Sequence, residues 1–139
     1  MVGDIIGQIE AFPVWLQWWL RWMQVLLILV PFFFIRRREA QILLVAQVLN
    51  FGVGFLVLQW DGGYVTKLFG LGHVFWAIAY VWIAWRWRDG LIDWEGRPLY
   101  RAWIVAAMIT LTISLPLDAY DLVQYANGMR TPMVEYYSN

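Results

Sequence analysis

Cysteine is absent from this chain of 139 residues, and histidine occurs once, as His73. The lack of cysteine excludes disulfide bonds, thiolate metal sites and catalysis by a thiol. A single histidine excludes a multi-histidine metal site within one protomer. The sequence also contains no HExxH pair, no GxSxG elbow and no glycine-rich phosphate loop. We therefore expect a protein that is not an enzyme and that holds neither a metal nor another cofactor.

Charged residues are scarce as well: they make up 14% of the chain, whereas hydrophobic residues make up 62%. That balance is too apolar for a soluble domain and predicts a lipid bilayer as the surroundings. The net charge is zero, which argues against nucleic acid as a partner. Eleven tryptophans and seven tyrosines fit the same setting, because amphipathic rings are favoured at the depth of lipid headgroups.

Four long apolar segments follow one another, separated by polar turns or loops. A helix of roughly 22 residues rises about 33 Å, enough to cross a hydrocarbon core of about 30 Å. We therefore predict an all-α fold, with one transmembrane domain over residues 1–139 and four transmembrane helices in an antiparallel bundle. The predicted spans are Val14 to Ile35, Glu39 to Trp60, Leu68 to Trp87 and Ala102 to Tyr120, the last with an extension to Ala126 left open.

The segment before Pro13 has the pattern of a short amphipathic helix that lies on the membrane surface. Its leading part is acidic, so we do not expect a cleaved signal peptide. Apolar residues lie at helical spacing opposite polar ones: Ile5, Ile6, Ile9 and Phe12 opposite Asp4, Gln8 and Glu10.

The basic residues are distributed unequally between the two sides of the predicted spans. Positive charges are retained on the cytoplasmic side of a membrane, so this asymmetry predicts that both termini are periplasmic. One side carries seven basic residues, Arg36, Arg37, Arg38, Arg86, Arg88, Arg97 and Arg101, and the other carries two, Lys67 and Arg130.

Each span has one polar or small-residue face, and polar side chains within a membrane normally face protein or a wet cavity. Four such faces predict a polar seam inside the bundle. The alternative is that several of these residues only join helices by hydrogen bonds, each worth about 0.6 to 2 kcal/mol. The candidates to bind a ligand or line a path are His73, Tyr80, Arg21, Asp118, Asn50, Ser114, Gln24, Gln47 and Thr110.

Arg21 and Asp118 have opposite charges and share a predicted depth with His73, roughly 17 to 26 Å above the inner interface. We therefore expect these two residues to pair in the seam. Two alternatives stay open. The side chain of Arg21 could extend outward past Trp18 toward the headgroups, and Asp118 could lie at headgroup depth.

His73 is predicted to face the bundle interior beside Tyr80. Its stripe, which continues through Ala77 and Ala84, is the one in the third span that lacks large aliphatic residues. Any activity that depends on this histidine should change between about pH 5 and 7.5. The alternative is a neutral histidine whose hydrogen bond to one serine or carbonyl is purely structural.

The stretch RRREAQILLVAQVLN, together with LFGLGHVFW, resembles a group of small, uncharacterised bacterial inner-membrane proteins with four hydrophobic segments. The resemblance implies the bacterial inner membrane as the location and supplies no activity. Small multidrug exporters fit poorly, because they would be expected to carry a glutamate in the first span. This chain has Gln17, Arg21 and Gln24 as its polar residues there.

Three functions remain open at this point. The first is a small channel or transporter-like protein that works as a homo-oligomer through the polar seam. The second is a non-catalytic accessory subunit whose aromatic surface docks on a larger membrane complex. The third is a binder of a haem or chlorophyll-type ring, with His73 as the ligand and Tyr80 packed near it.

Overall fold

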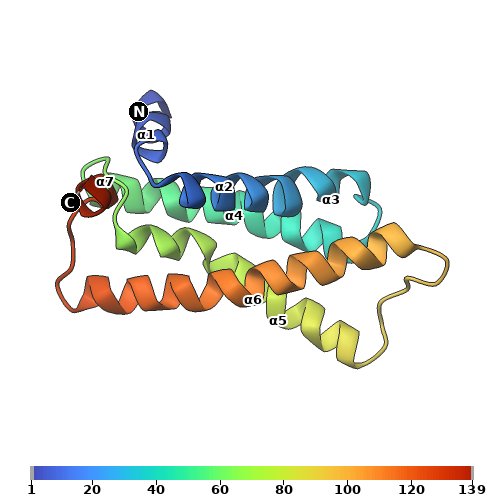
Figure 1. The fold of residues 1–139 in the computed structure, drawn as a ribbon. Coiled ribbons are helices and arrows are strands. Elements are labelled where there is room, and N and C mark those ends of the chain that lie inside the picture. Colours follow the sequence, from blue (N-terminus) through green and yellow to red (C-terminus); the bar gives the residue numbers. More distant parts are fainter. Residues whose placement is uncertain (1, 139) are drawn as a thin grey trace.

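The computed structural model describes the backbone of residues 2–138 and the side chains of residues 5–138. These residues form helices joined by loops, and none of them lies in a strand (Figure 1). The elements are α1 (Val2–Glu10), α2 (Val14–Gln24), the π-helical η1 (Val25–Leu29), α3 (Val30–Phe33), α4 (Arg38–Trp60), the 3₁₀-helical η2 (Lys67–His73), α5 (Val74–Arg88), α6 (Pro98–Ala126) and α7 (Met133–Ser138).

Four continuous helical segments are long and apolar enough to cross a membrane, which confirms the expected number. They are Val14–Phe33, Arg38–Trp60, Lys67–Arg88 and Pro98–Ala126. The last segment begins at a proline, which suits the first position of a helix because no hydrogen bond from its nitrogen is needed there. It then continues through Pro116 to Ala126 without a break.

The first span changes from α-helix to π-helix at Val25–Leu29, just before Pro31. In this wider register the N–H of Val30 bonds the carbonyl of Val25, five residues back. The carbonyl of Leu26 would need the N–H of residue 31, which proline lacks. The indole Nε1 of Trp103 donates to that carbonyl instead, at 2.9 Å. The buried backbone group is therefore satisfied by a side chain of α6.

The sequence predicted one continuous α-helix for the third span. The structure instead has the 3₁₀ segment η2 followed by α5. Gly70 and Gly72 lie in η2, and glycine disfavours the α-helix by about 1 kcal/mol relative to alanine. Figure 1 shows η2 lying between α4 and α6, with α5 then crossing α6 at an angle. The third span thus packs most closely where it is 3₁₀-helical.

Glycines allow this close packing of η2. A Cβ atom on Gly72 would lie 3.5 Å from the Cα of Gly54 on α4. A Cβ atom on Gly70 would lie 3.2 Å from the backbone oxygen of Asp118 on α6, closer than ordinary van der Waals contact. The backbone of η2 therefore approaches both neighbouring helices directly.

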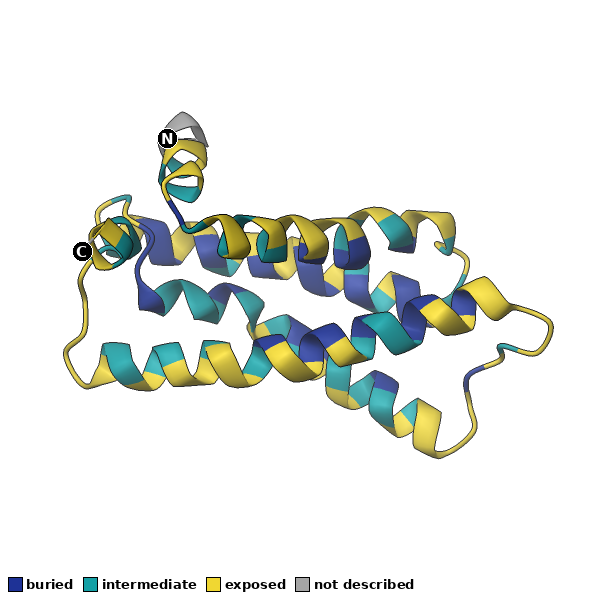
Figure 2. Ribbon diagram, in the orientation of Figure 1, coloured by how far each residue is buried: buried dark blue, intermediate teal, exposed yellow. Residues whose placement is uncertain are grey.

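The main hydrophobic core joins the central parts of all four spans. Its most buried members include Leu27, Leu43, Ile83, Ile104 and Leu111. Figure 2 shows that exposed residues, in yellow, cover the outward sides of the long helices. Many of these outward side chains are large and apolar, as expected for helix surfaces that contact lipid.

Candidate functional site

His73 and Asp118 form a polar contact between the third and fourth spans. The imidazole Nδ1 lies 2.9 Å from the carboxylate Oδ2 of Asp118. Both side chains are about four-fifths buried, with exposed fractions of 20% and 19%. A carboxylate can only accept a hydrogen bond, so Nδ1 carries the shared proton when Asp118 is ionised. Gly70 lies directly against the backbone of Asp118, and its lack of a side chain permits this contact.

The ring of Trp76 stacks on the His73 imidazole, with centroids 4.7 Å apart and planes 15° apart. Trp76 is buried, and its Nε1 has no hydrogen-bond partner among the described residues. The indole thus covers one face of the histidine and fixes the orientation of its ring. The indole N–H of Trp76 is therefore a buried donor that can still form a hydrogen bond, and leaving it unpaired lowers the stability of the fold.

Asn50 on α4 binds the start of α5. Its Oδ1 accepts a hydrogen bond from the backbone N–H of Phe75, at 2.9 Å. The first N–H groups of a helix have no partner within the helix, so the asparagine satisfies one of them. The Nδ2 of Asn50 and the Oε1 of Gln47, one turn earlier, are buried and find no partner within the described part of the chain. These amides retain hydrogen-bonding capacity for a water molecule or a polar solute.

Ser114 and Thr110 precede Asp118 on the same face of α6 and are both buried. Thr110 Oγ1 accepts a hydrogen bond from the indole Nε1 of Trp22, at 3.0 Å, and thereby joins the fourth span to the first. The structure therefore brings His73, Asp118, Ser114, Asn50 and Gln47 into the contact region of three spans.

Arg21 does not pair with Asp118, so the predicted ion pair is wrong. Its side chain is exposed on α2 and lies over the ring of Trp18, 5.4 Å from the ring centroid. Arg21 and Gln24 line a separate hollow of about 200 Å³ between α1 and α2. The physical reason is that the inward side of this span is occupied by apolar residues such as Leu27.

Tyr80 is only half-buried, and its hydroxyl does not join the contact between His73 and Asp118. The Tyr80 hydroxyl lies 2.9 Å from Thr112 Oγ1, six residues before Asp118 on α6. The buried side of α5 is formed by Trp76, Ala79 and Ile83, one position away from the predicted stripe. That prediction assumed that small residues would face the interior, whereas a tryptophan and an isoleucine fill it.

Sequence reasoning missed a buried ionic cluster at the arginine-bearing end. Glu39, only 4% exposed, accepts a hydrogen bond from Arg86 Nε at 2.8 Å and another from the hydroxyl of Tyr100. The cluster ties α4, α5 and α6 together. A single acidic residue at the start of an apolar span, directly after three arginines, was the available signal. From the sequence, Arg86 counts only as a determinant of orientation.

A second missed cluster lies at the opposite end. Lys67 is buried and its Nζ lies 2.9 Å from Asp121 Oδ1, one turn beyond Asp118. Tyr125 donates a hydrogen bond to Asp61 at 2.7 Å. The first contact fixes the start of η2 to α6, and the second fixes the end of α4 to α6, so both lie on the same side of the His73 to Asp118 contact.

The chain matches no family model, no curated protein and no solved structure. Within the described residues, no group of three or more histidine, aspartate or glutamate side chains could hold a metal ion. The arrangement places an imidazole and carboxylate pair near amides whose hydrogen-bonding capacity is only partly used.

Substituting Gly70 with alanine should displace Asp118 from His73, because the added methyl group would lie 3.2 Å from the backbone oxygen of residue 118. We expect a loss of about 1 to 3 kcal/mol in stability, the usual range for overpacking. Thermal unfolding in detergent, followed by circular dichroism, measures the change. Gly52→Ala is the matched control: nothing lies within 4 Å of its added atom, so it should be neutral or stabilising by up to about 1 kcal/mol. Equal effects of the two variants would contradict the close packing.

Proposed function

We propose that this protein is a small multi-pass membrane transport protein, channel-like or transporter-like, in which His73 and Asp118 form the working polar site. The observation that carries the proposal is their 2.9 Å contact within apolar, membrane-length helices. Ionisable residues are costly inside a membrane and commonly mark a path for ions, protons or substrate.

The pair is suited to bind and release a proton. Histidine is the side chain whose unperturbed titration falls between about pH 5 and 8. Protonation of the imidazole would turn its hydrogen bond to the Asp118 carboxylate into an ion pair, which changes the charge of the site without requiring a large movement. At this end of the packed elements the other charged groups are Lys67 and Asp121, which bind each other. The remaining charged residues of α4, α5 and α6 lie at the arginine-bearing end: Arg38, Glu39, Arg86, Arg88 and Arg101. The response is therefore assigned to His73.

We propose that the working form is a homo-oligomer. His73 and Asp118 each keep about one-fifth of their side-chain surface exposed, so a single chain does not seal the pair from its surroundings. In hydrocarbon an exposed polar surface of this kind is unfavourable. A second copy placed against this surface would cover it and complete the walls of a path.

A different observation supports an accessory-subunit role as the second candidate. Trp15, Trp18 and Trp22 are all largely exposed on one side of α2. Exposed tryptophans are enriched both at membrane interfaces and in protein contacts. If the purified protein is inert by itself but co-purifies in fixed stoichiometry with a larger membrane protein, this candidate replaces the first.

We also propose that the chain lies in a bacterial inner membrane with both termini periplasmic, as an antiparallel bundle whose α1 lies on the outer membrane surface. The loops that contain Arg36, Arg37 and Arg97 lie at one end of the molecule, and the chain termini lie at the other (Figure 1). This arrangement agrees with retention of positive charge in the cytoplasm.

Reporter fusions at the C-terminus should test this orientation. Alkaline phosphatase fused after residue 139 should be active, because it folds only in the periplasm, and green fluorescent protein at the same position should be dark. Fusions within the loop at Gly96 should give the opposite pattern. A fluorescent C-terminal fusion would overturn the proposed orientation.

Purified protein in planar bilayers or vesicles should conduct potassium ions or protons, and the flux should depend on pH. We expect His73→Gln to abolish this pH dependence and Asp118→Asn to weaken it. Arg21→Gln is the control, because that residue lies on the outside of α2 and should leave the profile unchanged. Absence of any flux from wild-type protein, or an unaltered profile in His73→Gln, would contradict the proposal.

A further inference from the structure

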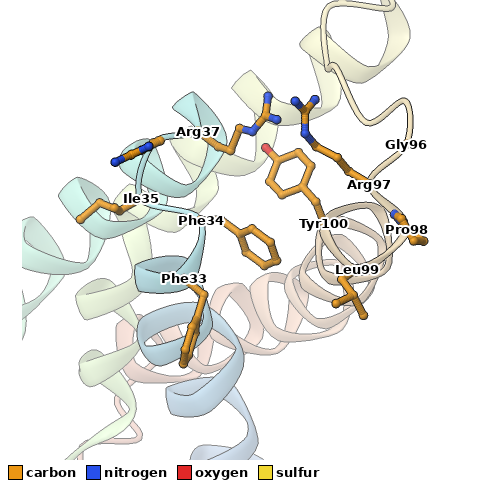
Figure 3. A pocket seen from close by; sticks show the side chains of 10 residues that line it. Phe33, Phe34, Ile35, Arg37, Gly96, Arg97, Pro98, Leu99 and Tyr100 are labelled. Carbon is orange, nitrogen blue, oxygen red and sulfur yellow. The ribbon is translucent and has the colours of Figure 1, made fainter.

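A pocket of about 490 Å³ lies at the arginine-bearing end of the molecule, between the end of α3 and the start of α6. Figure 3 shows phenylalanine and leucine side chains along its lower part and arginine side chains above them. The pocket is remote from His73 and Asp118, which lie toward the opposite end of the spans. It therefore calls for an explanation separate from the proposed transport site.

The lower wall of the pocket is apolar and open to the outside. Phe33 and Leu99 are 85% and 78% exposed, although each belongs to a helix of membrane length. Phe34 forms the inner wall and is held in place by stacking on Trp103, with centroids 5.3 Å apart. The groove is thus preformed and apolar, and it opens toward the position of lipid chains.

The upper rim carries more positive charge than the neighbouring acid can neutralise. Arg36, Arg37 and Arg97 all line the pocket. Asp93 lies 2.6 Å from Arg97 and 3.6 Å from Arg37, whereas Arg36 has no ion pair among the described side chains. Two guanidinium groups therefore share one carboxylate, and a third arginine of the rim has no acidic partner among the described side chains. Retention of positive charge on one side of a membrane accounts for arginines at this end, but not for an apolar groove beneath them.

We propose that this pocket binds one anionic phospholipid from the adjacent leaflet, with its phosphate on the arginine rim and an acyl chain along Phe33 and Leu99. Guanidinium groups bind phosphate oxygens in a bidentate manner and recognise an anion more strongly than lysine does. A zwitterionic lipid would bring no net charge to the rim, and a free phosphate would leave the apolar groove unused. The proposal does not depend on the transport function.

Asp93 should act as an internal competitor for the lipid phosphate. The hydrogen bond from Arg97 lowers the pKa of the Asp93 carboxyl, which keeps it ionised at neutral pH. A phosphate must displace this carboxylate to reach Arg37 and Arg97. Removing the charge at position 93 should therefore strengthen lipid binding, a gain that misfolding could not produce.

Native mass spectrometry of the detergent-purified protein, titrated with phosphatidylglycerol or with phosphatidylcholine of the same chains, tests the proposal. We expect preferential retention of one phosphatidylglycerol per chain. Loss of each arginine should weaken binding about fivefold, as for basic residues at an anionic membrane surface, so Arg36→Gln with Arg97→Gln should weaken it more than tenfold. Leu99→Asn should weaken binding of the same lipid, and Asp93→Asn should strengthen it.

Arg88→Gln is the matched control for loss of positive charge, because Arg88 lies at the same end but does not line the pocket. It should leave the retained lipid unchanged. The proposal is overturned if the two lipids bind equally, if Arg88→Gln weakens binding as much as the pocket arginines do, or if inorganic phosphate displaces the lipid. The last result would identify an anion site without specificity for lipid.

Discussion

The close approach of η2 to α4 and α6 is the constraint on which the rest of this structure depends. Gly54, Gly70 and Gly72 remove the side chains that would otherwise separate the three backbones. In a membrane, helices gain little from the hydrophobic effect when they associate, so close van der Waals contact between small residues carries much of the packing. The same approach brings Asp118 within reach of His73, so the packing of the third span and the geometry of the polar site have one cause.

The need to satisfy buried polar groups without water explains several other features. The π-helical turn before Pro31 leaves the Leu26 carbonyl for the indole of Trp103. Asn50 supplies the acceptor that the start of α5 requires. In hydrocarbon, an unsatisfied backbone group costs several kcal/mol, and at these two points a side chain from another span supplies the missing partner. Tryptophan and asparagine thus act as hydrogen-bonding partners as well as packing residues.

The sequence predicted the four membrane-length helices, because hydropathy and length report directly on what a bilayer requires. It also placed His73 and Asp118 at one depth. It did not predict that the third span begins as a 3₁₀-helix, since that depends on tertiary contacts of Gly70 and Gly72. The expected partner of Asp118 was Arg21, chosen by opposite charge and depth. Neither quantity reports the direction in which a side chain points around a helix, and Arg21 lies on the outer side.

Nitrogen NMR of the protein labelled in its single histidine tests the central claim most directly. Because His73 is the only imidazole, its two ring nitrogens give unambiguous signals. At a pH where the ring is neutral, the account predicts that the proton resides on Nδ1, as donor to the Asp118 carboxylate, and that Asp118→Ala removes this preference. A ring protonated on Nε2 in the wild type, unchanged in Asp118→Ala, would show that the two residues do not form the site.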